Sequence, residues 1–183
     1  NNNISTPALI TQHYAKKVVK AADISQDGRY ALVSNNQQVC VWNNLQNKKL
    51  YPCISGPEGQ LIELLGISQS NDYFYTSNRI NVHLYQRATG RLITVWSAGD
   101  NIINDIAMSD DGSTMIFGFR SGQASIVGVH SGTVNTFPIH RLDINSVALS
   151  SDGLTAFTGS SDKTAKRWHT QTGQVKNTFN HQM

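Results

Sequence analysis

Four consecutive segments of this chain repeat one plan, and they begin at Val18, Gln60, Ile102 and Ile144. Each opens with a short alternating apolar run that ends in serine (ADIS, LGIS, IAMS, VALS). A polar turn follows, then two more short apolar runs and a fourth that closes the unit. In three of the four units this first turn contains Asp-Gly, whose glycine supplies the positive φ that tight hairpins need. The runs are rich in β-branched and aromatic residues and show no helical period, so they predict an all-β chain.

The spacing of the units narrows the architecture. The turn carboxylates Asp27, Asp72, Asp111 and Asp152 are 45, 39 and 41 residues apart. A period of roughly 40–45 residues with four short strands per unit is typical of a β-propeller. We therefore predict a propeller over residues 8–183, built from four four-stranded antiparallel blades at 13–55, 56–98, 99–139 and 140–183. Residues 1–7 (NNNISTP) predict a polar N-terminal tether.

Charge content and hydropathy do not indicate a nucleic-acid-binding protein or a membrane-spanning one. Charged residues make up 15% of the chain, below the roughly 25% that is usual for soluble domains. The formal net charge is +3, and no block of like charges or basic tail is present. This mild balance permits an acidic partner without indicating nucleic acid. No apolar run approaches the roughly 18 residues of a membrane span.

The fourth unit resembles a WD40 repeat over the run HRLDINSVALSSDGLTAFTGSSDKTAKRW. In that family a histidine, a hydroxyl residue, a turn aspartate and a third-strand tryptophan form a buried hydrogen-bonded chain within one blade. The matching residues here are His140, Thr158, Asp162 and Trp168. His169 replaces the aspartate that follows the tryptophan in the family. The resemblance implies a structural hydrogen-bond tetrad in this blade.

The other three units keep the strand pattern and lose the polar residues. Trp42 holds the tryptophan position in the first unit, whereas Tyr85 and Val127 hold it in the second and third. We therefore expect the tetrad in the fourth blade alone, and apolar packing between sheets in the others.

The number of units predicts an incomplete ring. Most propellers have six to eight blades, so four would form about half of a larger ring of seven or eight and would leave two apolar sheet faces uncovered. Residues 8–12 (ALITQ) resemble an outer strand, and Asn180-His181 resembles the start of a further blade. We expect a fragment of a longer ring. The alternatives are a homodimer that completes an eight-blade ring and a closed four-blade ring.

Few residues form a pattern that indicates chemistry. Cys40 and Cys53 match no metal-ligand spacing and are expected to be two small buried side chains, with a disulfide as the alternative in an oxidising compartment. The six histidines form no HxH or HExxH motif, and His83 is expected to be exposed on its strand. No nucleophile elbow is present. We predict no catalytic site, no metal and no cofactor.

The loops suggest where a partner binds. In this fold the loops before the first strand and between the second and third strands lie on one face. The basic residues of these loops are Lys16, Lys17, Arg79, Arg120, Arg141 and Lys163. The turn carboxylates lie on the opposite face. We hypothesise a basic face that binds an acidic protein segment. The alternative is that these are ordinary solvated loop charges.

These patterns predict a non-catalytic protein-interaction scaffold that docks a partner through its loop faces. The alternative is an enzyme or ligand-binding propeller with an axial site. Nucleic-acid binding is not expected, because no aromatic stacking platform accompanies the basic loops. The run TQHYAKKVVKAADISQDGRYALVS and the degenerate blades also resemble bacterial WD40-repeat lipoproteins of the cell envelope. That resemblance implies a lipid anchor upstream of Asn1, a periplasmic location and a multi-protein envelope assembly, with a cytoplasmic scaffold as the alternative.

Overall fold

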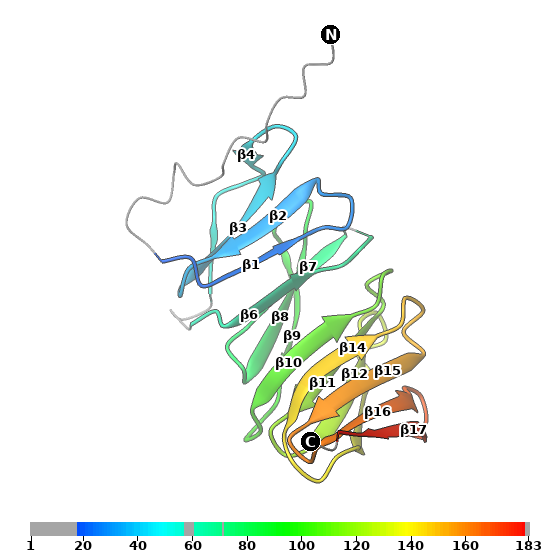
Figure 1. Ribbon diagram of the computed structural model, residues 1–183. Coiled ribbons are helices and arrows are strands. Elements are labelled where there is room, and N and C mark those ends of the chain that lie inside the picture. The colour runs from blue at the N-terminus through cyan, green and yellow to red at the C-terminus, as the bar shows by residue number, and fades with distance from the viewer. Residues whose placement is uncertain (1–17, 57–60, 71, 182–183) are drawn as a thin grey trace.

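The computed structural model describes residues 18–56, 61–70 and 72–181. Their strands form four antiparallel sheets that follow one another in chain order (Figure 1). This arrangement confirms the prediction of an all-β fold built from propeller blades. The predicted tether at 1–7 and the strand-like run at 8–12 lie outside the described residues.

The sheets of blades 2, 3 and 4 are simple meanders in which neighbouring strands are consecutive in the chain, and the sheet of blade 1 departs from this order in its outer strand. Blade 1 contains β1 (Ala21–Ile24), β2 (Tyr30–Ser34), β3 (Gln38–Asn43), β4 (Lys48–Lys49) and β5 (Ile54–Ser55). Blade 2 contains β6 (Leu64–Ile67), β7 (Tyr73–Ser77), β8 (Asn81–Gln86) and β9 (Leu92–Ser97). Blade 3 contains β10 (Ile103–Met108), β11 (Thr114–Phe119), β12 (Gln123–Gly128) and β13 (Val134–Pro138). Blade 4 contains β14 (Ile144–Leu149), β15 (Thr155–Ser160), β16 (Thr164–His169) and β17 (Val175–Asn180).

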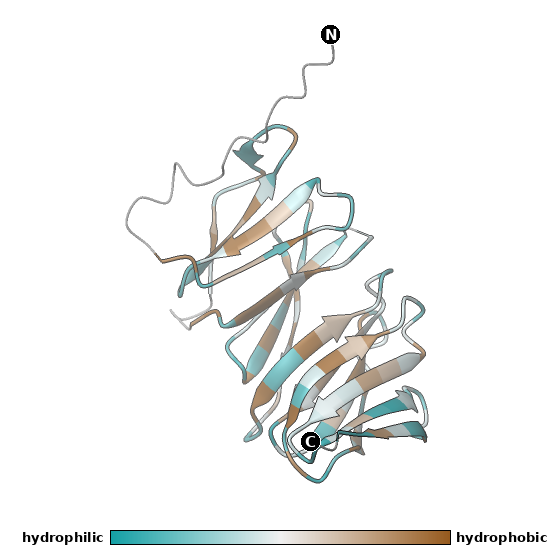
Figure 2. Cartoon of the chain, viewed as in Figure 1, coloured by the Kyte–Doolittle hydropathy of each residue, from teal (hydrophilic) through white to brown (hydrophobic). Residues whose placement is uncertain are grey.

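The hydrophobic core lies between the blades. Successive side chains of a strand point to opposite faces, so the central strands of an inner blade have apolar residues on both faces. Hydrophobic residues are visible along β2 of blade 1 and β6 of blade 2 in Figure 2. Between blades 3 and 4, for example, Ile116 packs into one cluster with Ile144, Ala156 and Trp168. The blades are therefore joined by apolar contact between sheets.

Polar contacts also join neighbouring blades. The Asp23 carboxylate accepts a hydrogen bond from the Ile67 backbone amide of blade 2 at 3.0 Å. Asp105 accepts one from the Val147 amide of blade 4 at 2.8 Å. Between blades 2 and 3 the Tyr75 hydroxyl donates to a backbone carbonyl of β10 at 2.9 Å. Burial raises the pKa of Tyr75, and the carboxylates of Asp105 and Asp23 raise it further. Each of the three junctions thus has a polar contact beside its apolar core.

The turn between the first and second strands has the same hydrogen bonds in three blades. A serine hydroxyl donates to the aspartate two residues later in the pairs Ser25–Asp27, Ser109–Asp111 and Ser150–Asp152. In blade 2 Ser70 holds the aspartate position, and its hydroxyl lies 3.2 Å from that of Ser68. The use of Asp72 as the matching turn carboxylate was therefore wrong, because Asp72 lies two residues further on. Counted from the serines, the repeat spacings are 43, 41 and 41 residues.

The four blades form an open row. The first and fourth sheets lie at opposite ends of it (Figure 1). The closed four-blade ring that the sequence left open is not formed.

Blade 1 differs from the others in its outer strand and its cysteines. The strand is split into β4 and β5, with Pro52 between them, which has no amide hydrogen to donate to the ladder. Cys40 and Cys53 form a disulfide across this break, with their Cα atoms 4.4 Å apart. The expectation of two separate buried thiols was wrong. At the same cross-strand position of blade 3, the hydroxyls of Ser125 and Thr136 are 2.6 Å apart. Blade 1 thus has a disulfide where blade 3 has a hydrogen bond between two hydroxyls.

The disulfide closes a loop in a strand that has lost part of its ladder, so its removal should be costly. We expect Cys40→Ser with Cys53→Ser to lower the free energy of unfolding by about 2–3 kcal/mol, since the serine pair can form the hydrogen bond but leaves the unfolded chain unconstrained. Guanidinium denaturation measures this loss. Dithiothreitol should lower the midpoint of the wild type and leave that of the variant unchanged. A wild-type midpoint insensitive to dithiothreitol would contradict the prediction.

Candidate functional site

Blade 4 brings together the four residues that the WD40 resemblance singled out. His140 lies in the loop before β14, Thr158 on β15, Asp162 in the following turn and Trp168 on β16. The His140 Nδ1 atom is 2.9 Å from Asp162 Oδ2, and its Nε2 atom is 2.8 Å from Thr158 Oγ1. The Trp168 indole N–H donates to the same Thr158 oxygen at 3.3 Å. The chain of contacts runs from the surface loop to the buried tryptophan.

Asp162 is the centre of a wider network at the loop end of the chain. Its Oδ1 atom accepts hydrogen bonds from the Thr164 hydroxyl at 2.6 Å and the Thr164 amide at 3.0 Å. Its Oδ2 atom also accepts from the Arg141 amide at 3.2 Å. Burial raises the pKa of Asp162, but the hydrogen bonds outweigh it and hold this pKa well below the ordinary value. A charged carboxylate therefore ties the loop before β14 to the turn between β15 and β16.

The other blades contain incomplete versions of this network. Val33 of blade 1 occupies the register position of Thr158 in blade 4, beside Trp42. Within the described part of the chain, the buried Trp42 indole N–H has no hydrogen-bond partner. Blade 2 keeps a hydroxyl at this position, and a hydrogen bond to Thr76 partly offsets the burial that raises the pKa of Tyr85. The pair of Thr76 and Tyr85 was not predicted from the sequence, although the threonine of YFYTS aligns with that of TAFTG.

His83 is buried, so the expectation that it is exposed was wrong. It lies on β8, whose blade is covered by blade 1 on one face and blade 3 on the other. Burial lowers the pKa of His83, because the charged imidazolium loses its hydration. Alternation along a strand predicts exposure only where one face of the sheet meets water, and an inner blade has no such face.

Among the predicted partner-binding residues that the structure describes, two arginines are ion-paired. Arg79 forms an ion pair with Glu63 in the segment before β6. The Arg120 Nε atom is 3.8 Å from Asp143 Oδ2. Lys163 follows Asp162 in its turn with a positive φ of 66°. Lys16 and Lys17 lie outside the described residues.

Both loop faces carry charges of both signs within the described ranges. On the face with the predicted cations, the loops also contain the carboxylates of Glu63, Asp100, Asp143 and Asp162. On the opposite face, Arg29 lies in the same turn as Asp27, and Arg87 and Arg91 lie in the loop between β8 and β9. The hydrogen bonds from Ser113 and Ser109 lower the pKa of Asp111. The Asp111 carboxylate therefore stabilises its own turn.

The residues that the structure describes contain no group of three or more histidine, cysteine or acidic side chains placed to hold a metal ion. They include no helix with the length and hydrophobicity needed to cross a membrane.

The low pKa of Asp162 makes the tetrad sensitive to acid. The folded state favours the carboxylate, so its contribution to stability is present above roughly pH 4, the unfolded pKa, and is lost as the pH falls below that value. We expect Asp162→Asn to lower the free energy of unfolding by about 1–3 kcal/mol at pH 7, because buried partners lose a charged acceptor. The deficit should shrink by pH 2.5. Urea denaturation at the two pH values measures it, with the exposed Asp72→Asn as the control. An equal deficit at both pH values would argue against this role of the charge.

The unpartnered indole of Trp42 predicts an unusually mild effect of a polar substitution. Val33→Thr places a hydroxyl oxygen where Thr158 supplies one to Trp168. We expect it to cost about 1 kcal/mol less than Val41→Thr, which buries the same hydroxyl on β3 where it meets no unpartnered indole. Thermal unfolding of the two variants compares these costs. Equal costs would show that the indole does not gain an acceptor.

Comparison with known proteins agrees with the geometry of blade 4. Residues 131–169 match the family model described as WD domain, G-beta repeat. This segment runs from the end of blade 3 through the first three strands of blade 4 and contains the whole tetrad. No curated protein matches the chain. The protein is thus an all-β chain of propeller blades in which residues 131–169 are similar to a WD40 repeat.

Proposed function

We propose that this protein is a non-catalytic scaffold that binds a protein partner through the loops of its blades. The observation that carries the proposal is the WD40 repeat at 131–169, because such repeats generally mediate protein–protein interaction. The row of sheets supports it, since rigid sheets hold many loops at fixed positions for contact with one large surface.

The binding surface is centred on the loops of blade 4. The Asp162 carboxylate fixes the backbone of Arg141 through a hydrogen bond, and Lys163 is the next residue in the turn. Arg79 and Arg120 are paired with carboxylates of the same face, so a partner would have to displace those carboxylates. Arg141 and Lys163 are therefore the cations that contact an acidic segment of the partner.

The disulfide of blade 1 supports an extracytoplasmic location. Disulfides persist in oxidising compartments such as the bacterial periplasm and are rare in the cytosol. Together with the resemblance of the first blade to envelope lipoproteins, it favours a periplasmic or envelope-associated scaffold. A lipid anchor upstream of Asn1 would hold such a scaffold at the membrane, where it would serve a multi-protein assembly.

Affinity capture from envelope fractions of the native host, followed by mass spectrometry, tests this function. We expect Arg141→Gln with Lys163→Gln to reduce recovery of the captured protein about 10-fold, because the variant lacks the two cations that face its acidic segment. The matched control is Arg29→Gln with Arg91→Gln on the opposite face, which should not change recovery. Binding that keeps its strength and its salt dependence in the loop variant would refute the assigned surface.

A further inference from the structure

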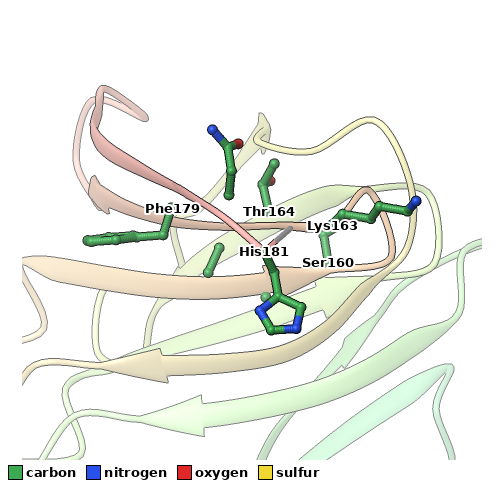
Figure 3. A pocket seen from close by; sticks show the side chains of 8 residues that line it. Ser160, Lys163, Thr164, Phe179 and His181 are labelled. Carbon is green, nitrogen blue, oxygen red and sulfur yellow. The ribbon is translucent and has the colours of Figure 1, made fainter. Parts of the chain in front are cut away.

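The outward faces of the two end blades differ in what they expose. Blade 4 is hollowed there by a cleft of about 780 Å³, with Phe179 and Lys163 at opposite ends and His181 between them (Figure 3). The face of blade 1 that turns away from blade 2 is buried instead, since Trp42 is 6% exposed and Cys40 is 1% exposed. The disulfide lies at the edge of this buried face, so its two sulfur atoms have different surroundings.

Cys40 is enclosed by apolar side chains, whereas Cys53 is partly exposed. Cys40 lies on β3 in a cluster with Ala31, Val33 and Trp42. Cys53 packs against that cluster from the segment between β4 and β5 and keeps part of its surface in contact with solvent. While blade 1 is folded, a reagent in solution can therefore reach the sulfur atom of Cys53 and cannot reach that of Cys40.

An ammonium group lies beside the more exposed sulfur atom. Lys49 Nζ is 3.8 Å from Cys53 Sγ. Lys49 is paired with Trp42 across the strands, and its ammonium lies 5.9 Å from the centre of the indole ring, which helps to hold it on this face. Lys48 is paired with Asn43, so its side chain points to the other face. A positive charge beside sulfur favours the thiolate, which is the nucleophilic form of cysteine.

The strand register places the two cysteines opposite each other without help from the covalent bond. Strand β5 pairs with β3 through Ile54 and Val39, so the next position along β3 faces Cys53. At the same position of blade 3, two hydroxyls form a hydrogen bond, and that sheet has the same register with no covalent link. The reduced form of blade 1 therefore holds both thiols ready to react with each other.

Formation of this disulfide by exchange passes through a mixed disulfide on one of the two cysteines. If Cys53 reacts first, its thiolate attacks an external disulfide, bonds to one half and releases the other half as a thiolate. The Cys40 sulfur then attacks Cys53, its proton passes to the departing half, and a second thiol is released. Two electrons in all pass from the protein to the oxidant. The reverse order would require the oxidant to enter the apolar cluster around Cys40.

We propose that Cys53 is the site at which an external disulfide reacts covalently with this protein, and that Lys49 activates its thiol for this reaction. The oxidant binds at Cys53 from outside the blade and leaves when Cys40 attacks. Because exchange is reversible, a reductant also enters at Cys53. This site lies in blade 1 and is separate from the loops of blade 4 that bind the partner.

Reaction with dithiodipyridine, a neutral disulfide that releases a coloured product, measures the reactivity of each cysteine by itself. Only Cys53 remains in the Cys40→Ser chain, and only Cys40 remains in the Cys53→Ser chain. We expect Cys53 to react at least about 100-fold faster, since a buried thiol reacts only when the blade opens. Near-ultraviolet circular dichroism checks that both variants fold. Equal rates, or a faster Cys40, would overturn the assignment.

Variants of the two neighbouring lysines test the role of the ammonium group in the Cys40→Ser chain. Lys49→Gln should slow the reaction of Cys53 about 3- to 10-fold, because the thiolate loses a neighbouring positive charge. Lys49→Arg should keep most of the rate. The control Lys48→Gln removes the same charge from the other face and should change the rate less than about 2-fold. A rate unaffected by Lys49→Gln, or lowered equally by Lys48→Gln, would overturn the role of Lys49.

The reduced wild-type chain gives a measurement that needs no variant. It is treated briefly with less than one equivalent of iodoacetamide and then digested with trypsin, which cleaves after Lys48 and Lys49 and so separates the two cysteines. Mass spectrometry should find at least about 10-fold more label on Cys53 than on Cys40, because the thiolate of Cys53 is favoured and accessible. Label divided evenly between them, or mainly on Cys40, would contradict the proposal.

Discussion

Apolar contact between the faces of neighbouring blades is the interaction on which the rest of this structure depends. Each blade is a thin meander that cannot bury its own side chains, so a residue such as Ile116 leaves water only when the next sheet covers it. The contact also needs empty space on one side, which Gly118 provides for Val147 and Ile144. Interdigitation of this kind fixes the distance between the sheets, and the polar bonds of Asp23, Tyr75 and Asp105 form beside it.

One cross-strand position shows how far the blades have diverged within this common packing. Cys40 of blade 1 is bonded to Cys53 there, and blade 3 has a pair of hydroxyls. Blade 2 places the buried His83 at this position. Blade 4 has Lys166, whose ammonium donates to the Ile139 carbonyl at 2.6 Å. The strand register is the same in all four blades, so this position accommodates a disulfide, a pair of hydroxyls, a histidine or a lysine.

The repeat predicted the architecture because alternation and turn residues act locally, within a few positions of one another. The repeat did not predict the features that depend on pairing between residues far apart in the sequence. The disulfide requires Cys53 to lie opposite Cys40, and that register becomes visible only once the break at Pro52 is placed. The ion pair between Arg79 and Glu63 joins the turn between β7 and β8 to the segment before β6. The tetrad residues could be named in advance because the run around Trp168 resembles a known repeat, whereas composition alone gave no sign of them.

The two blades at the ends of the row contain the disulfide and the four-residue hydrogen-bonded chain. Blades 2 and 3 have a neighbour on each side, whereas blades 1 and 4 each have one. In a row held together by nearest-neighbour contacts, the terminal units are the first to fray. Blade 1 has its disulfide and blade 4 its buried hydrogen-bonded chain. The end blades are thus stabilised by bonds within the blade as well as by contact with one neighbouring sheet.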